Sequence, residues 1–384
     1  MPTAVRQLIL KLHSRCNLAC DYCYVYESAD QGWRRQPGSM SPAILDLVAG
    51  RIADHARAHG LRHLTVTLHG GEPIMAGADL IEHAVAGITR AVPPETRLEF
   101  TIQTNGLLLT ADLLRLFDIL DLRVGISLDG PADANDRHRR FRHGGGSYSR
   151  VREALDLLRE PPFRRLYGGI LCTVDTANDP LAVYRHLVSF EPPRLDFLLP
   201  HGNWTTPPPG STPGSGETPY ADWLIPIFDL WYSGGGTTDV RLFTSIISLL
   251  VGGRSASEAV GLERSALLVI ETDGTIEQVD SLKTTAAGMT ATGCDVWTHS
   301  FDEALAHPGI TAQYQGFAGL APACQRCEIA SVCGGGLYAH RYRAEDGFNN
   351  PTVYCADQLR LIQHIRQRVA EDLEGIRRRA TSAS

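Results

Sequence analysis

The chain has 384 residues, 43% of them hydrophobic, which is enough for a large domain with a buried core. Its formal net charge of −7 argues against a nucleic-acid binder, because such proteins normally present a basic face. No run of about 18 apolar residues occurs, and the N-terminal MPTAVRQLILKLHSRC lacks the long apolar core of a signal peptide. We therefore expect a cytoplasmic protein with no membrane span.

Strands and helices alternate along the first half of the chain. Strands are predicted at residues 6–13, 64–70, 98–106, 123–130, 168–174 and 195–200. Helices are predicted from Ser41, over 78–91, from Thr110 to about Leu120, over 147–159 and over 180–190. This alternation is typical of an α/β fold with a parallel sheet, either a partial barrel or a doubly wound sheet.

The second half is less regular. Residues 205–219 are rich in Pro, Gly and Ser and predict an irregular surface loop. Residues 220–232 predict a helix whose aromatic side chains pack on the first half rather than line a substrate groove. Residues 269–280 predict a hairpin that turns at Asp273–Gly274, and a long helix is predicted from Ala356.

Polar and sulfur-containing motifs follow four of the predicted strands. They are a cysteine cluster (16–23), HGGEP (69–73), QTNG (103–106) and SLDGP (127–131). The carboxyl ends of parallel strands meet at one edge of a sheet, where α/β enzymes place their chemistry. We therefore expect these four motifs to converge on one site.

The first cluster, CNLACDYC, has the spacing C-x3-C-x2-C at Cys16, Cys20 and Cys23. In a reducing compartment, grouped cysteines indicate metal binding or catalysis more often than disulfides. A tetrahedral zinc site would need a fourth ligand, which His13 can supply. Alternatively, three thiolates can hold three irons of a 4Fe–4S cluster and leave the fourth iron open, which suggests a catalytic cluster.

This spacing, with Tyr22 before the last cysteine, resembles the signature of radical S-adenosylmethionine (SAM) enzymes, and the later strand-end motifs match that family in order. The resemblance implies a partial (β/α)6 barrel in which Cys16, Cys20 and Cys23 hold a 4Fe–4S cluster whose open iron is chelated by SAM. It implies that the cofactor is bound by Tyr22, Gly70, Gly71, Glu72, Asn105, Ser127, Asp129 and Arg139.

The residue types suit those roles. A Gly-Gly turn lets backbone carbonyls approach a ligand, and the Glu72 carboxylate suits the cationic amino group of the cofactor. Asn105 and Ser127 are short polar side chains suited to ribose or carboxylate contacts. Arg139 can pair with the cofactor carboxylate as a bidentate donor. Taken singly, each is equally well explained as a turn residue, because Asn-Gly and Asp-Gly are common turn dipeptides.

A second cluster, CQRCEIASVC, gives C-x2-C-x5-C, and Cys355 follows it. Four cysteines fit a four-thiolate zinc site or an iron–sulfur site. The pattern resembles the SPASM extension of peptide-modifying radical enzymes, which implies an auxiliary 4Fe–4S cluster. Its ligands would be Cys324, Cys327, Cys333 and Cys355.

A full SPASM extension holds a first auxiliary cluster as well. The places of two of its ligands are occupied here by Val279 and Leu337, and Cys294 alone cannot hold a cluster. We therefore predict two clusters in all. Asp280 lies beside the lost ligand and is a candidate general base, or else a residue that hydrogen-bonds within the hairpin. The predicted segments are a barrel (1–204), a loop with bridging helices (205–260) and a SPASM-like module (261–384).

The runs QVDSLK, TGCDVWTHSFDEALAHPGI and LLPHGNW resemble FxsB-type maturases of ribosomally made peptides. That resemblance implies a precursor peptide as substrate and an external electron donor such as a flavodoxin or ferredoxin. The implied product is a cyclophane, in which the Cβ of one residue is linked to an aromatic ring two positions earlier.

Three other functions are compatible with the sequence. One is a sulfatase-type maturase that oxidises Cys or Ser to formylglycine, although the missing first auxiliary cluster counts against it. Another is a maturase that forms thioethers. The third is not an enzyme but a zinc-stabilised peptide-binding module, which iron analysis would distinguish.

Overall fold

The computed structural model describes residues 4–234, 238–263 and 266–382, and these contain a single ten-stranded sheet. The strand order is β10-β9-β8-β1-β2-β3-β4-β5-β6-β7. Six consecutive parallel strands form its centre: β1 (Val5–His13), β2 (His63–Gly70), β3 (Arg97–Thr104), β4 (Leu122–Ser127), β5 (Tyr167–Thr173) and β6 (Arg194–Leu198). This confirms the predicted α/β fold with a partial (β/α)6 barrel.

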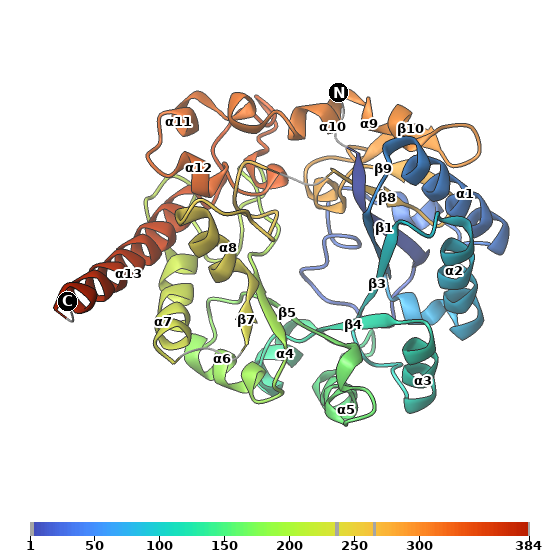
Figure 1. The fold of residues 1–384 in the computed structure, drawn as a ribbon, viewed down its shortest axis with the longest axis horizontal. Coiled ribbons are helices and arrows are strands. Elements are labelled where there is room, and N and C mark those ends of the chain that lie inside the picture. Colours follow the sequence, from blue (N-terminus) through green and yellow to red (C-terminus); the bar gives the residue numbers. More distant parts are fainter. Residues whose placement is uncertain (1–3, 235–237, 264–265, 383–384) are drawn as a thin grey trace.

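Helices connect the parallel strands and lie around their outer side (Figure 1). They are α1 (Pro42–His59), α2 (Ala78–Ala91), α3 (Ala111–Ile119), α4 (Ala132–His138), α5 (Tyr148–Arg159) and α6 (Pro180–Val188). Two begin as the sequence predicts, because Ser41 Oγ accepts from Ile44 N (3.3 Å) and Thr110 Oγ1 accepts from Leu113 N (3.3 Å).

The two faces of the central strands differ in polarity. On β2, Leu64, Val66 and Leu68 are fully buried, while the alternate positions, Thr65, Thr67 and His69, are partly exposed. Successive side chains of a strand point to opposite faces. The apolar face therefore packs under the helices, and the polar face is left for the interior of the barrel.

The C-terminal half adds to the same sheet. Its strands are β7 (Asp239–Val240), β8 (Ala266–Ile270), β9 (Thr275–Glu277) and β10 (Ala291–Asp295). β8 pairs in parallel with β1 and antiparallel with β9, so the hairpin of the third predicted segment extends the sheet of the first. The predicted turn at Asp273–Gly274 is confirmed, with Gly274 at φ 84°.

The remaining helices are α7 (Pro219–Ser233), α8 (Arg241–Leu250), α9 (Phe301–Leu305), α10 (Pro308–Gln313), α11 (Pro322–Gln325), α12 (Ala330–Cys333) and α13 (Cys355–Ser382). The aromatic helix α7 packs on the barrel as predicted, since Trp223 is buried and its ring lies 5.4 Å from that of Phe197. Short 3-10 turns occur at η1 (Gly32–Arg35), η2 (Pro73–Ala76), η3 (Arg164–Leu166), η4 (Asp280–Thr284), η5 (Gly316–Gly319) and η6 (Tyr338–Arg341).

Two strands end earlier than predicted. β3 ends at Thr104 and β4 at Ser127, because Gly106 (φ 80°) and Gly130 (φ 132°) take backbone conformations that leave the strand. Helices α4 and α8 were not predicted, since α4 is short and polar and α8 is an apolar run that periodicity alone does not distinguish from a strand. Within the described ranges, no helix is both long and apolar enough to cross a bilayer.

Candidate active site

The first three cysteines lie on the loop that follows β1. All three are free and partly buried, and Cys23 N donates to Cys20 O at 3.1 Å. Burial raises the pKa of Cys16 to about 11 and that of Cys20 to about 12, and the neighbouring thiols shift both in the same direction. Such thiols become good ligands when a cation displaces their protons.

The spacing of the thiols distinguishes between kinds of metal site. In a tetrahedral zinc site, with Zn–S bonds of about 2.3 Å, the sulfurs lie about 3.8 Å apart. In the part of the chain that the structure describes, no three cysteine sulfurs all lie within 4.8 Å of one another. The three thiols still influence one another's pKa values, so they share one site. This arrangement fits a cluster of several irons better than a single ion.

Two glycines bring the end of β2 against the cysteine loop. A Cβ on Gly70 would lie 2.1 Å from His13 O, and one on Gly71 would lie 1.8 Å from the Tyr26 hydroxyl. Gly71 N donates to His13 O (2.8 Å), which joins the two loops. The glycines therefore permit close contact between two protein segments, whereas the sequence indicated an approach to a ligand.

Glu72 links the ends of β2 and β3. Its buried carboxylate accepts from Ile74 N (3.1 Å), Thr104 Oγ1 (2.7 Å) and Asn105 N (2.8 Å). A carboxylate has about four acceptor positions, so capacity for one further donor remains. Asn105 in turn lies beside the cysteine loop, with Nδ2 3.7 Å from Cys16 Sγ and 2.8 Å from Asn17 Oδ1.

Tyr22, Asp129 and Arg139 form a second connection between the cysteine loop and the strand ends. The Tyr22 hydroxyl donates to Asp129 Oδ2 and accepts from Arg139 Nη1 (2.9 Å). Arg139 is 8% exposed, and its buried Nε has no hydrogen-bond partner among the described residues. A buried guanidinium with a free donor beside the cysteines fits the carboxylate of an amino-acid cofactor.

Ser127 is the last residue of β4 and lies on the interior face. Its Oγ accepts from Gln103 Nε2 at 2.9 Å, which connects it to the neighbouring strand β3. The four strand-end motifs therefore converge as predicted. Whether the residues named in them contact the cofactor stays a prediction.

Asp280 belongs to a buried group of charged side chains at the β1–β8 edge of the barrel. Lys11 Nζ donates to Asp280 Oδ1 (2.7 Å) and to Glu271 Oε1 (2.6 Å). Burial favours a higher pKa for Asp280, but Lys11 and Lys283 outweigh it and the pKa is lowered. The sequence analysis missed Lys11, Glu271 and Lys283. A lone lysine inside the apolar strand LILKLH was the available signal.

The second cysteine group is assembled from three short elements. Cys324 and Cys327 lie at α11 and just after it, Cys333 ends α12, and Cys355 begins α13. Burial raises the pKa of Cys333 to about 12, with contributions from Cys355 and Cys324, so these thiols also share a site. Cys333 Sγ additionally donates to Gln358 Oε1 at 2.9 Å. Four thiols gathered this way fit a cluster with four protein ligands.

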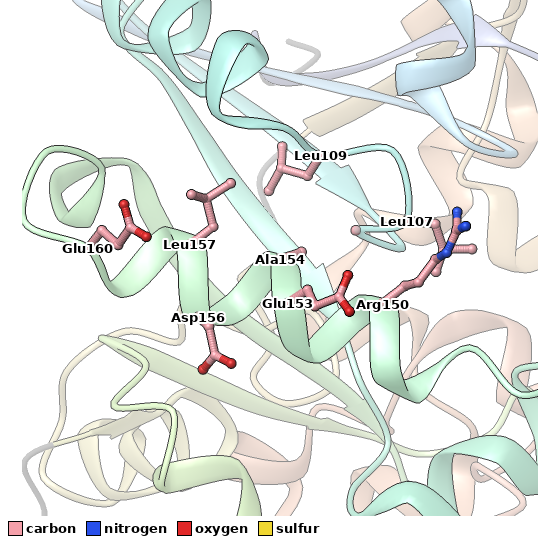
Figure 2. Close-up of a pocket in the computed structure, with 9 residues that line it drawn as sticks. Leu107, Leu109, Arg150, Glu153, Ala154, Asp156, Leu157 and Glu160 are labelled. Atoms are coloured by element: carbon pink, nitrogen blue, oxygen red, sulfur yellow. The ribbon is translucent and has the colours of Figure 1, made fainter.

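A surface groove of about 460 Å³ lies elsewhere, between the segment after β3 and α5 (Figure 2). Its lining includes Leu107, Leu109, Glu153, Asp156 and Leu157, and none of the predicted site residues. The groove is therefore separate from the chemistry described above.

Comparison with known proteins agrees with the fold and the site. Residues 10–185 match the Radical SAM superfamily. The chain is 23% identical to a cysteine-type anaerobic sulfatase-maturating enzyme of Clostridium perfringens (strain 13 / Type A), over 91% of this chain and 92% of that protein. It is 22% identical to a serine-type anaerobic sulfatase-maturating enzyme of Bacteroides thetaiotaomicron, over 91% and 86%.

Solved structures give the same picture. The structure described as native anSMEcpe with bound AdoMet aligns with a TM-score of 0.80 at 21% identity, over 95% of this chain and 98% of that one. Streptococcus suis SuiB bound to the precursor peptide SuiA aligns with a TM-score of 0.60 at 13% identity, over 92% and 76%. These relatives correspond to the sulfatase-type alternative rather than to cyclophane formation. The barrel with its three-cysteine loop is that of a radical SAM enzyme, whose cofactors are S-adenosylmethionine and 4Fe–4S clusters.

Proposed function

We propose that this chain is a peptide maturase that oxidises the side chain of a Cys or Ser residue in its substrate. The observation that carries the proposal is the likeness to a cysteine-type sulfatase-maturating enzyme over 91% of this chain, a length that includes both cysteine groups. When bound, S-adenosylmethionine and the first cluster supply a 5′-deoxyadenosyl radical that removes a hydrogen atom from the substrate Cβ.

The residues of the chain divide the remaining work. Cys16, Cys20 and Cys23 would hold the first cluster, and Arg139 would pair with the cofactor carboxylate. After the hydrogen atom has left, the substrate must lose one proton and one electron to complete a two-electron oxidation. Asp280 takes the proton at its carboxylate. Cys324, Cys327, Cys333 and Cys355 would hold the cluster that accepts the electron, and an external carrier such as a flavodoxin or ferredoxin would exchange electrons with the enzyme.

A second candidate function is the cyclophane crosslink. It is favoured by Val279 and Leu337, which stand where the resemblance to SPASM enzymes implies ligands of a first auxiliary cluster. Without that cluster, the set of groups near the substrate differs from that of a full SPASM enzyme. The hydrogen removal and the proton acceptor would be the same as above, and only the fate of the Cβ radical would differ.

One experiment tests both candidates. The reconstituted, reduced enzyme is incubated with SAM and three peptides: a Cys-containing sulfatase-type peptide, its Ser version, and a peptide with an aromatic residue two positions before the target. Side-chain oxidation gives an aldehyde that hydrazine traps, detected by mass spectrometry. A crosslink gives a loss of two hydrogens with no trapped aldehyde. Absence of 5′-deoxyadenosine in every reaction would contradict the radical mechanism.

A further inference from the structure

The buried charged group around Asp280 contains two lysines and three carboxylates. Lys283 Nζ lies 3.1 Å from Glu271 Oε1 and 2.9 Å from Glu277 Oε2, and Lys11 Nζ lies 2.6 Å from the same Glu271 oxygen. The side chains of Lys11, Lys283, Glu271 and Asp280 are each 5% exposed or less. Charges removed from water in this way are retained only when they are closely paired.

The two lysines treat Asp280 differently. Lys11 donates a hydrogen bond to Asp280 Oδ1 at 2.7 Å, whereas Lys283 lies 3.7 Å from that oxygen and directs its hydrogen bonds to the two glutamates. The other carboxylate oxygen, Asp280 Oδ2, is buried and has no hydrogen-bond partner among the residues that the structure describes. Lys11 therefore determines which oxygen of Asp280 is engaged and which is left available.

Other titratable groups face Asp280 from the surrounding elements. They are His69 at the end of β2, His201 after β6, and Tyr24 on the cysteine loop. Burial lowers the pKa of His69 and lowers that of His201 to about 4, and burial raises the pKa of Tyr24. All three are uncharged near neutral pH, so the positive charge at Asp280 comes from the lysines.

We propose that Lys11 is a positioning residue for the reaction, which fixes Asp280 through Oδ1 and leaves Oδ2 as the atom that accepts the substrate proton. The inference rests on the proposed function, in which Asp280 is the base. The proton passes from the substrate to Oδ2, and no bond to Lys11 forms or breaks. A carboxylate held by an ammonium has a low proton affinity, so it accepts a proton only from a substrate that loss of a hydrogen atom has already made more acidic.

The test compares Lys11→Met with Lys283→Met. Each variant removes one buried ammonium from the same group, so both should lose thermal stability to a similar degree. Only Lys11→Met should raise the pKa of Asp280 by about one unit or more, because it removes the hydrogen-bonded cation. The pKa is followed by carbon-13 NMR of enzyme labelled at Asp Cγ, with the signal assigned by Asp280→Asn. Product formed per 5′-deoxyadenosine should fall about tenfold in Lys11→Met and change less than about twofold in Lys283→Met.

The double variant Lys11→Met/Glu271→Gln preserves the charge balance if Lys11→Met alone does not fold, and it is compared with Glu271→Gln. Equal effects of the two lysine replacements, or an Asp280 pKa that does not move, would overturn the role of Lys11. The titration needs no peptide, so it decides the Lys11–Asp280 interaction separately. Failure of the wild-type enzyme to modify any of the three peptides would instead count against the proposed function.

Discussion

At the scale of single residues, the Tyr22 hydroxyl is the centre of the contact between the cysteine loop and the strand ends. It joins Asp129 and Arg139, two buried residues of opposite charge that have few other partners in the described ranges. Loss of this hydroxyl would leave both charged groups with an unsatisfied position in a buried place, which is costly.

Tyr22→Phe should therefore lower the free energy of unfolding by about 1–3 kcal/mol and weaken SAM binding. Urea unfolding and calorimetric titration with SAM measure the two effects. Tyr167→Phe is the matched control, because the Tyr167 hydroxyl is also buried but has no partner among the described residues. The control should be neutral or slightly stabilising. A Tyr22→Phe enzyme as stable as the control would refute the role of this hydroxyl.

The two cysteine groups lie on separate elements, so they should lose metal independently. Cys16→Ala should abolish SAM cleavage while the iron of the second group remains, as measured by iron and sulfide analysis and by 5′-deoxyadenosine release. Cys294→Ala is the control, since Cys294 on β10 belongs to neither group and its removal should leave both iron contents unchanged. Loss of all iron in Cys16→Ala would show that the two sites depend on each other.

At the scale of secondary-structure elements, the contact between the loop after β1 and the end of β2 depends on the absence of side chains. The backbone of Gly71 lies so close to Tyr26 and to Arg15 O that a methyl group has no space there. The cysteine spacing can produce a metal site only while this contact holds the loop in place.

Gly71→Ala should displace the cysteine loop and reduce the iron content of the first group, with the second group retained. Its added Cβ would lie 2.5 Å from Arg15 O, a backbone atom that cannot move without the loop. Gly87→Ala in α2 is the control: no atom lies within 4 Å of its added Cβ, and alanine favours a helix by about 1 kcal/mol over glycine. Electron paramagnetic resonance of the reduced enzyme distinguishes the two outcomes, and an unchanged first-cluster signal in Gly71→Ala would contradict the prediction.

At the scale of the whole molecule, α13 fastens the second cysteine group to the barrel (Figure 1). Asp357, two residues after Cys355, is buried and accepts from Tyr220 N (2.8 Å) and Ala221 N (2.9 Å) at the start of α7. The first N–H groups of a helix have no partner within it, so Asp357 caps α7 from a distant part of the chain.

Asp357→Ala should cost about 1–3 kcal/mol of stability and reduce the iron content of the second group, because α13 carries Cys355. Asp229→Ala is the control: Asp229 also joins α7 to α13, through His364 and Arg368, but its side chain is 36% exposed. An exposed ion pair contributes less than about 1 kcal/mol. Thermal unfolding and iron analysis compare the two, and equal losses would contradict a capping role for Asp357.

The sequence by itself determined the elements and the motifs, because their causes are local. Helix α2 has the bounds that the apolar periodicity predicts, Thr110 caps α3, and the hairpin turns at Asp273–Gly274. The C-x3-C-x2-C spacing also acts within a single loop, so it indicated a three-thiol site before the fold was known.

Only the tertiary structure decided which distant residues act together. Lys11 and Asp280 are 269 positions apart, and they meet because β8 pairs with β1 and brings the hairpin region to the first strand. Glu72, predicted to bind the cofactor, accepts three hydrogen bonds from the ends of β2 and β3. Such pairings depend on strand order and burial, which no spacing along the chain expresses.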